Sequence, residues 1–280
     1  MKSGIIIDIE EIEKLDASVT DENYNYLDAK MKEFIKKVDE ESFDIEKFIS
    51  GKVINVTSLS KEVFPIVEEE FDFFISYSYS NVEPVNKLAN YLSKLGFKVF
   101  VDNQEWKSVY TLLKKFDEKI CQTGKNLYSY DLRNTTTSNM YSMLSIALTK
   151  VIGRSKYFVL VKSEDLYKEI SNYGFYPNNT IENKSKKYTT SPWLEHEIEI
   201  FNLIVPYNKF HENYLRKIAE SFGTESKDSY IWEREYNLKE EYFSFLKLSD
   251  LNKMNNYYSK VESERKLDEC LINNYKNKRR

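Results

Sequence analysis

The stretch FDFFISYS, residues 71–78, indicates the class of fold. It is a short apolar run rich in aromatic residues, which is typical of a strand buried on both faces of a sheet. An amphipathic segment follows over residues 82–95, with Gly96 where a helix is expected to stop. The sequence FKVFVD, residues 97–102, then predicts a second strand. Strand, helix and strand within about 30 residues form one βαβ unit with parallel strands.

A second helix and strand extend this pattern. Residues 143–153 predict an apolar helix, and residues 157–163, YFVLVKS, form the continuous apolar run expected of a central parallel strand. We therefore predict an α/β domain with a central parallel sheet flanked by helices. The residues expected to be buried at the centre of this sheet are Ile75, Val99, Val101, Val159 and Val161.

The segments around this core are less regular. Residues 1–66 predict a helical extension that precedes the main domain, which we place over residues 67–280. Two long polar segments, 103–139 and 170–190, each follow a predicted strand and are interpreted as loops. Ligands of open α/β sheets bind at the carboxyl ends of the strands, so we expect both loops to border one crevice, with 103–139 mobile above it. The C-terminal part predicts one more strand or helix and a terminal helix.

The composition excludes several classes of protein. The formal net charge of −4 argues against a general nucleic-acid binder, and no segment has the roughly 20 apolar residues of a membrane span. Two distant cysteines and no signal peptide favour the cytoplasm. Seven scattered glycines give neither a P-loop nor a dinucleotide fingerprint. With two histidines, at 196 and 211, no metal site is expected.

The order of these features resembles the Toll/interleukin-1 receptor (TIR) family. FDFFISYS is similar to the first conserved box of TIR domains, and the helix ending in Leu-Gly, the strand VFVD and the later apolar strand follow in the family's order. After a loop comes Ser-x-Trp-x-x-x-Glu, at residues 191–197. The match covers residues 70–205. It departs from the family in the longer segment after Asp102 and in Leu194, where the family often has Cys.

The helix that begins near residue 191 contains three glutamates that are not equivalent. Ser191 suits the N-cap and Pro192 the first helical position. At about 100° per residue, Glu197 lies on the face of Trp193, Ile200 and Phe201. Glu195 and Glu199 lie on the far side, where we expect solvated charges, and His196 is expected at the surface. Glu197 is therefore predicted to be partly buried, either as a catalytic acid or as the partner of a lysine.

The resemblance implies a flavodoxin-like fold and a choice between two functions. Some TIR domains are scaffolds that only associate, and others cleave the nicotinamide–ribose bond of NAD; in the latter, the position of Glu197 is the catalytic one. NAD is then the substrate, with no separate cofactor. Residues expected to contact it are Ser76, Tyr77, Ser78, Asp102, Trp106 and Trp193.

The roles of two of these residues stay open at this point. Trp106 lies where the family's mobile loop covers the nucleotide or meets a neighbouring subunit, although it could equally anchor a loop. Asp102 could suggest the phosphoacceptor of a receiver domain, but a receiver needs an acidic pair where this chain has Ser76-Tyr77-Ser78. The family further implies self-association through TIR surfaces and, for bacterial members, antiphage signalling in which a nucleotide product reaches a downstream effector.

Overall fold

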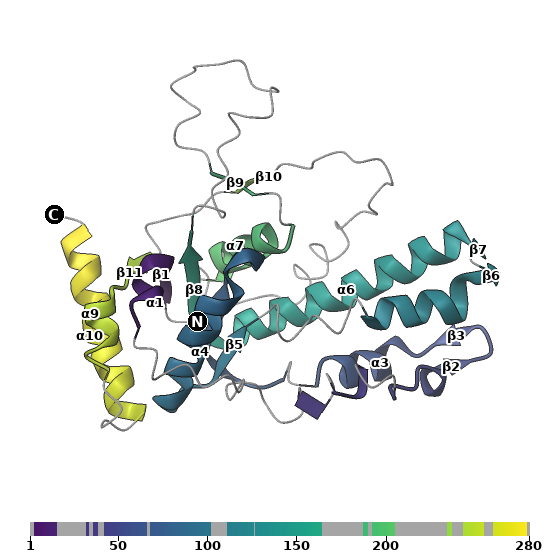
Figure 1. Ribbon diagram of the computed structural model, residues 1–280, viewed down its shortest axis with the longest axis horizontal. Coiled ribbons are helices and arrows are strands. Elements are labelled where there is room, and N and C mark those ends of the chain that lie inside the picture. Colours follow the sequence, from purple (N-terminus) through teal and green to yellow (C-terminus); the bar gives the residue numbers. More distant parts are fainter. Residues whose placement is uncertain are drawn as a thin grey trace, which may run out of the picture.

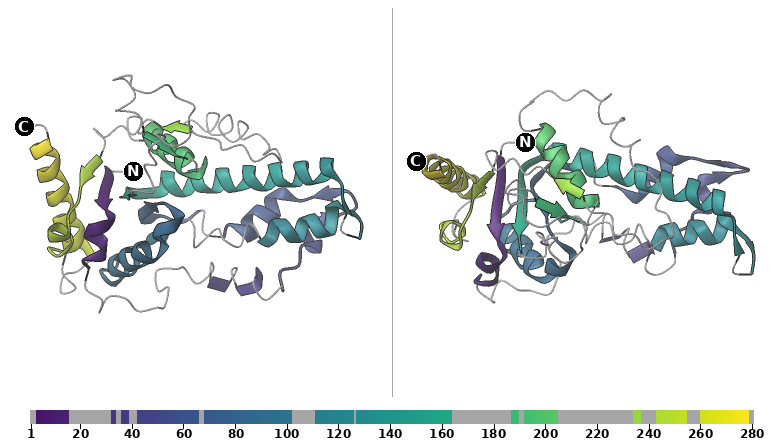
Figure 2. Two further views of the ribbon diagram at one scale, coloured as in Figure 1. Left: turned by 45° about the horizontal axis from the view of Figure 1, so that its top comes forward. Right: turned by 90° about the horizontal axis from the view of Figure 1, so that it is seen from above.

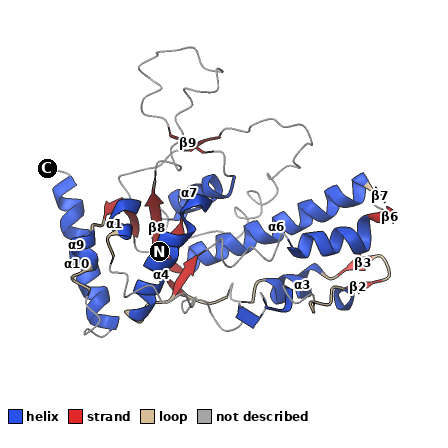
Figure 3. Cartoon of the chain, viewed as in Figure 1, coloured by secondary structure: helices blue, strands red, loops and turns tan. Residues whose placement is uncertain are grey.

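A five-stranded parallel sheet forms the centre of the protein in the computed structural model (Figures 1 and 3). The structure describes residues 3–15, 32–33, 36–38, 42–65, 68–101, 111–125, 127–163, 187–189, 192–204, 234–236, 243–254 and 260–278. The strands lie in the order β11 (Phe243–Phe245), β1 (Ser3–Asp8), β8 (Ser155–Lys162), β4 (Phe71–Ser76) and β5 (Val99–Val101), and every neighbouring pair is parallel. The α/β class and the central parallel sheet predicted from the sequence are confirmed.

The predicted βαβ unit is present. β4 is buried along its whole length, and α4 (Val82–Lys94) connects it to its neighbour β5. Gly96 follows the end of α4 with a φ of 84°, a left-handed conformation that glycine adopts without steric cost. The five residues predicted to lie at the centre of the sheet are all at most 1% exposed.

Helices cover both faces of the sheet. On one face, α6 (Tyr130–Arg154) and α7 (Pro192–Ile204) pack on Ile6, Phe74, Phe158 and Leu160. The opposite face contacts α4, α1 (Ile9–Glu13), α9 (Leu248–Leu251) and α10 (Lys260–Lys278). Of the described helices, none combines the length and apolar character that crossing a membrane requires.

The prediction of a helical extension over residues 1–66 is wrong for its first part. Ser3–Asp8 form β1, which pairs with β8 and β11 inside the sheet. The domain boundary at residue 66 therefore does not separate this strand from the core. Strands β5, β4 and β8 lie side by side in the 2-1-3 arrangement with which a flavodoxin-like sheet begins, and the N-terminal strand β1 occupies the next position, between β8 and β11.

The remaining N-terminal residues contribute to an arm that extends sideways from the sheet (Figures 1 and 2). The arm comprises η2 (Glu46–Phe48), the hairpin β2 (Ile49–Ser50) and β3 (Val53–Ile54), α3 (Val56–Val63), residues 111–125 and 127–128, and the first half of α6. Its apolar residues, such as Phe48, Leu59, Phe116 and Met140, belong to the same hydrophobic core cluster as the α6 face of the sheet.

The predicted loop over residues 103–139 is likewise corrected for its described part. Residues 111–116 are helical and continue into the π-helical turn η4 (Asp117–Cys121), the hairpin β6 (Gln122–Gly124) and β7 (Leu127–Tyr128), and then α6. Ser129 begins α6 because its side chain accepts a hydrogen bond from the Leu132 amide. Polar residues 134–139 thus lie in a helix of 25 residues rather than in a loop above the sheet.

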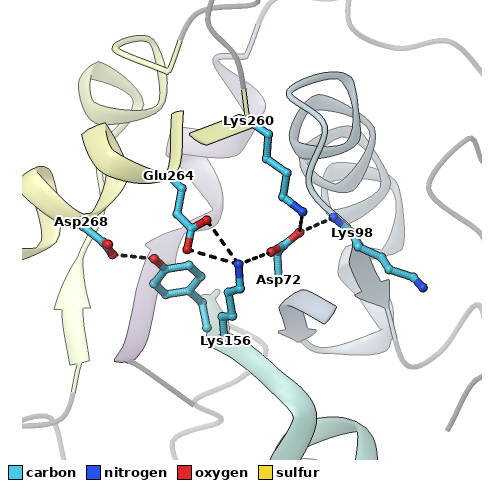
Figure 4. Close-up of polar contacts among 7 residues, drawn as sticks. Asp72, Lys98, Lys156, Lys260, Glu264 and Asp268 are labelled. Atoms are coloured by element: carbon cyan, nitrogen blue, oxygen red, sulfur yellow. Dashed lines mark hydrogen bonds and ion pairs between the residues drawn. The ribbon is translucent and has the colours of Figure 1, made fainter. Parts of the chain in front are cut away.

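An ion-pair cluster at the amino edge of the sheet joins β4 to its neighbours (Figure 4). Asp72 is 3% exposed, and its carboxylate contacts Nζ of Lys156 at 3.0 Å and Nζ of Lys260 at 2.6 Å. The amide of Lys98 donates to the same carboxylate at 2.8 Å. Burial raises the pKa of Asp72, but these hydrogen bonds outweigh it and hold the pKa below its usual value of 3.8.

The same cluster attaches the C-terminal helix to the sheet. From α10, Glu264 accepts hydrogen bonds from Lys156 at 3.2 Å, and Asp268 accepts one from the hydroxyl of Tyr157 at 2.5 Å. Asp72 lies in the first stretch quoted above, at the Asp of the TIR-like box. Its contacts in this protein are structural, at the end of the sheet opposite the predicted site.

Candidate functional site

The carboxyl ends of β4 and β8 mark the point in the sheet where the strand order reverses. From β4 the connection through α4 leads to β5 on one side, whereas β8 pairs with β4 on the other side. In open α/β folds, ligands bind in the crevice at such a switch point. Ser76, Tyr77 and Ser78, predicted from the sequence to contact a ligand, follow β4 at this point.

Ser76 has an unusual environment among them. Its side chain is fully buried, and its Oγ has no hydrogen-bond partner among the described residues. A buried hydroxyl without a partner costs about 1–3 kcal/mol, so such groups are uncommon unless a ligand or an ordered water satisfies them. Tyr77 is also buried, and Ser78 is partly exposed with its Oγ 3.1 Å from that of Ser80.

A buried hydrogen bond connects the segments that follow β4 and β8 at the carboxyl edge of the sheet. The side-chain amide of Asn81 donates to Oγ of Ser163 at 2.6 Å, and both residues are buried. Asn81 ends the turn η3 (Tyr79–Asn81) just before α4, and Ser163 follows β8. The bond therefore fixes the segment after β4 relative to the end of β8. Sequence reasoning did not identify Asn81, since a single asparagine in a polar turn gives no specific indication.

The position of α7 is set by aromatic packing on the sheet. Phe201 stacks on Phe158 of β8 with ring centroids 4.8 Å apart, and its ring centroid lies 4.6 Å from that of Phe243. One turn later, Ile204 approaches Gly153, which lies next to the start of β8. The helix thus runs opposite to β8, from the carboxyl edge toward the amino edge. Pro192 is its first residue, as predicted, while Ser191 lies outside the described residues.

This packing places Glu197 toward the carboxyl edge of the sheet. Glu197 precedes Phe201 by about one helical turn, so it lies roughly 5.4 Å farther toward the carboxyl edge than Phe201 does. Two residues of a strand span a similar distance, which on β8 is the step from Phe158 to Leu160. Glu197 therefore lies at the level of Leu160, whose neighbour on β4 is Ser76. Ser76 and Leu160 share the face of the sheet that α7 covers. Glu197 is 2% exposed, so its predicted burial is confirmed.

The other two glutamates differ from Glu197. Glu199 is exposed, as predicted, and Glu195 is partly buried rather than fully solvated. Trp193, expected at the pocket wall, is partly buried, and its ring centroid lies 5.7 Å from that of Tyr141 on α6. Glu197 is thus the buried acid of this helix, one turn beyond a tryptophan that packs against α6.

The prediction that His196 lies at the surface is wrong. The residue is 3% exposed, with Nε2 3.1 Å from Oγ of Ser145 and 3.4 Å from Oγ1 of Thr149. Burial lowers the pKa of His196 to about 4, so the imidazole is neutral near pH 7. Ser145 and His196 are both buried, and their contact joins α6 to α7.

A lysine that sequence reasoning missed lies at the same edge of the sheet. Nζ of Lys162, the last residue of β8, is 3.1 Å from the carboxylate of Asp8 at the end of β1. By strand alternation, both side chains lie on the α7 face. Lys162 thus brings a positive charge to the face that carries Glu197. No local motif indicates it, because the pair depends on the unpredicted strand β1.

Part of the predicted site falls in segments that the structure does not describe. Asp102 and Trp106 lie outside the described residues, as does most of the predicted loop over 170–190; its residues Lys187–Thr189 form β9, which pairs with β10 (Arg234–Tyr236). Within the described ranges, no group of His, Cys, Asp and Glu side chains could hold a metal ion. Comparison of the chain with protein-family models, curated proteins and solved structures finds no match.

Proposed function

We propose that this protein is a TIR-like enzyme that cleaves the nicotinamide–ribose bond of NAD, with Glu197 as the catalytic carboxylate. One observation carries the proposal: a buried acid on α7 lies level with the buried hydroxyl of Ser76, which has no described partner, at the sheet's switch point. The sequence resemblance then indicates the substrate.

The reaction suits a single carboxylate. When the glycosidic C–N bond breaks, both bonding electrons go to nicotinamide, which leaves as a neutral molecule and needs no general acid. The ribose carbon develops oxocarbenium character, and a nearby anion such as Glu197 stabilises this positive charge. A water oxygen then bonds to the ribose carbon and releases a proton, giving ADP-ribose; attack by a nitrogen of the adenine gives a cyclic isomer instead.

The remaining groups at this edge suit the rest of the dinucleotide. The hydroxyls of Ser76 and Ser78 offer hydrogen bonds to its polar groups, and the ammonium of Lys162 offers charge to the pyrophosphate. In this proposal Tyr77 and Trp193 line the pocket, and Asp102 and Trp106 contact the nucleotide from the segment after β5. The nucleotide product would act on a downstream effector, as in bacterial antiphage signalling, with association of TIR surfaces controlling turnover.

The proposal is tested by incubating the purified protein with NAD, both dilute and concentrated, and identifying the products. Where the wild type is active, Glu197→Gln should reduce nicotinamide release by two to three orders of magnitude, roughly 3–4 kcal/mol of barrier. Glu199→Gln, on the exposed side of the same helix, is the matched control and should stay within a factor of a few. Glu195→Gln, at a partly buried position, should also retain activity.

Two outcomes would contradict the catalytic assignment. In the first, all three variants release nicotinamide at the same rate. In the second, Glu197→Gln is unfolded by circular dichroism, which would make Glu197 a structural acid. Either result would favour the non-catalytic alternative, a scaffold that acts through TIR–TIR association.

A further inference from the structure

The carboxylate of Asp8 stands where two different partners are within its reach. Asp8 is the last residue of β1 and also the N-cap of α1, with a φ of −69° and a ψ of 137°, an extended backbone that suits an N-cap. An aspartate at this position commonly accepts a hydrogen bond from an amide of the first helical turn, but the side chain of Asp8 makes no such bond. Its Oδ1 lies instead 3.1 Å from Nζ of Lys162. Helix α1 therefore begins without a side-chain cap.

The pair of Asp8 and Lys162 lies at the carboxyl edge of the sheet, on the face that α7 covers. The two residues are register partners on adjacent parallel strands, so their side chains share a face. Leu160, two residues earlier on the same face of β8, pairs with Ser76 of β4. Lys162 therefore lies roughly 7 Å beyond the level of Ser76 and Glu197, which is within the length of a dinucleotide.

This ion pair is accessible and weak. The side chains of Lys162 and Asp8 are 43% and 47% exposed, and neither forms another ion pair with a described residue. Because water solvates both charges, an exposed pair of this kind contributes little to stability. A phosphoryl group carries more negative charge than a carboxylate and has more acceptor oxygens, so it competes effectively for the ammonium. Lys162 can therefore change its partner at low cost.

The backbone of Lys162 is fixed, although its side chain is not. On one side, Lys162 pairs with Asp8 of β1 at the end of β8. On the other side, the next residue, Ser163, accepts the buried 2.6 Å hydrogen bond from Asn81. A change of partner at Lys162 therefore requires only side-chain rotation, and a position held in this way loses little entropy when a ligand binds.

We propose that Asp8 is an internal competitor for a phosphoryl anion that binds Lys162. In the free protein, the carboxylate of Asp8 occupies the ammonium. When the anion binds, Asp8 releases Lys162, and its carboxylate rotates to accept a hydrogen bond from the first amides of α1. This capping bond offsets part of the lost ion pair. The identity of the anion as the pyrophosphate of NAD rests on the proposed function, whereas the exchange of partners does not.

Anion binding tests the exchange without NAD turnover. Isothermal titration calorimetry measures the affinity for inorganic pyrophosphate and for ADP-ribose, which carries the same group within a nucleotide. Asp8→Asn removes the competing charge and keeps a side chain that can cap α1, so both ligands should bind about three- to fivefold more tightly. Lys162→Met should abolish pyrophosphate binding, and Asp8→Asn added to Lys162→Met should not restore it.

Glu68→Gln is the matched control for net charge. It changes the charge of the protein by the same amount as Asp8→Asn and releases Lys150 and Arg154 from exposed pairs at the amino edge of the sheet. Its affinity for pyrophosphate should equal that of the wild type. Thermal unfolding verifies that every variant is folded.

Hydrogen exchange measured by NMR reports the movement of Asp8. Saturating pyrophosphate should slow the exchange of the amides of Glu10 and Glu11 several-fold in the wild type, because a carboxylate then caps them. Asp8→Ala has no capping side chain, so pyrophosphate should bind to it without slowing these amides. Slowing that is equal in both proteins would contradict the rotation of Asp8.

The outcomes separate this proposal from the proposed function. Absence of pyrophosphate binding, equal affinity in the wild type and Asp8→Asn, or an equal gain in Glu68→Gln would overturn the exchange, even if the wild type releases nicotinamide from NAD. The expected gain in Asp8→Asn without nicotinamide release would support the exchange and contradict only the proposed function. ADP-ribose that binds no more tightly than pyrophosphate would likewise support the exchange and indicate a free anion as the ligand.

Discussion

Gly4 and Phe201 meet at a point where only glycine fits. A β-carbon on Gly4 would lie 2.5 Å from the ring of Phe201 and 2.8 Å from that of Phe243, closer than nonbonded carbons approach one another. The absence of a side chain in β1 therefore lets Phe201 lie flat on the sheet. Since Phe201 is one turn beyond Glu197, the N-terminal strand helps to set the position of the candidate catalytic acid.

Gly4→Ala should therefore destabilise the protein by about 1–3 kcal/mol, because the methyl group must displace Phe201, Phe243 or β1 itself. Phe201→Leu in the same chain should remove part of this cost, so that the double variant is more stable than the sum of the single effects predicts. Urea unfolding of the four proteins measures this coupling. Gly153→Ala is the control: its β-carbon would lie 3.8 Å from Ile204, and stability should be unchanged or higher. Strict additivity would show that no steric contact exists.

His196 should make the stability depend on pH. Its pKa is about 4 in the folded protein, against a usual 6.5, because burial disfavours the charged ring. Above pH 6.5 it is neutral in both states and contributes nothing to the pH dependence. As the pH falls from about 6.5 to about 4, only the unfolded chain gains the proton, so the free energy of unfolding decreases by about 3 kcal/mol. In His196→Asn the decline over this range should be smaller by that amount. An equal decline in both proteins would contradict it.

Asp72→Asn should lower the free energy of unfolding by about 2–4 kcal/mol, because Lys156 and Lys260 then face each other without the carboxylate. The native pKa of Asp72 lies below 3.8, so its stabilisation is present above about pH 4 and is lost as the pH falls through the native pKa. Guanidinium unfolding at pH 7 and pH 3 measures both effects. Glu68→Gln is the control, since its pairs with Lys150 and Arg154 are exposed and contribute under about 1 kcal/mol.

Ser76→Ala separates a ligand contact from a structural one. The hydroxyl has no partner among the described residues, so its removal should not lower stability, whereas Ser145→Ala should cost about 1–2 kcal/mol through the loss of its bond to His196. If the hydroxyl binds NAD, Ser76→Ala should raise KM about tenfold at unchanged folding. A stability loss equal to that of Ser145→Ala would assign Ser76 a structural role.

The parts of the fold that follow from local patterns were predictable. Three strands, β4, β5 and β8, are continuous apolar runs, and α4 is an amphipathic segment; turn residues bound each of them. Their order along the chain dictates parallel pairing. β1 has the same kind of apolar run, Ile5–Ile7, but the run is short and leads directly into an acidic helix. Its place between β8 and β11 is a long-range property that no local pattern contains.

For the candidate site, the sequence could predict which residues of α7 share a face, because helix periodicity determines this. Periodicity separated Glu197 from Glu199 correctly. It misplaced His196, because a helical face is buried or exposed according to what packs on it, and α6 covers a second side of α7. The polar start of α6 gave no indication of a helix for a related reason: packing in the arm stabilises a segment with weak amphipathic character.

The location of β1 also determines when this protein can fold during its synthesis. Gly4 of β1 pairs with Phe158 of β8 on one edge and with Phe243 of β11 on the other, so the second edge stays open until residues 243–245 have been made. Contacts this distant in sequence slow folding and delay its completion. Glu197 therefore reaches its final position only after β11 has been made, and a nascent or truncated chain that ends before β11 lacks the finished candidate site.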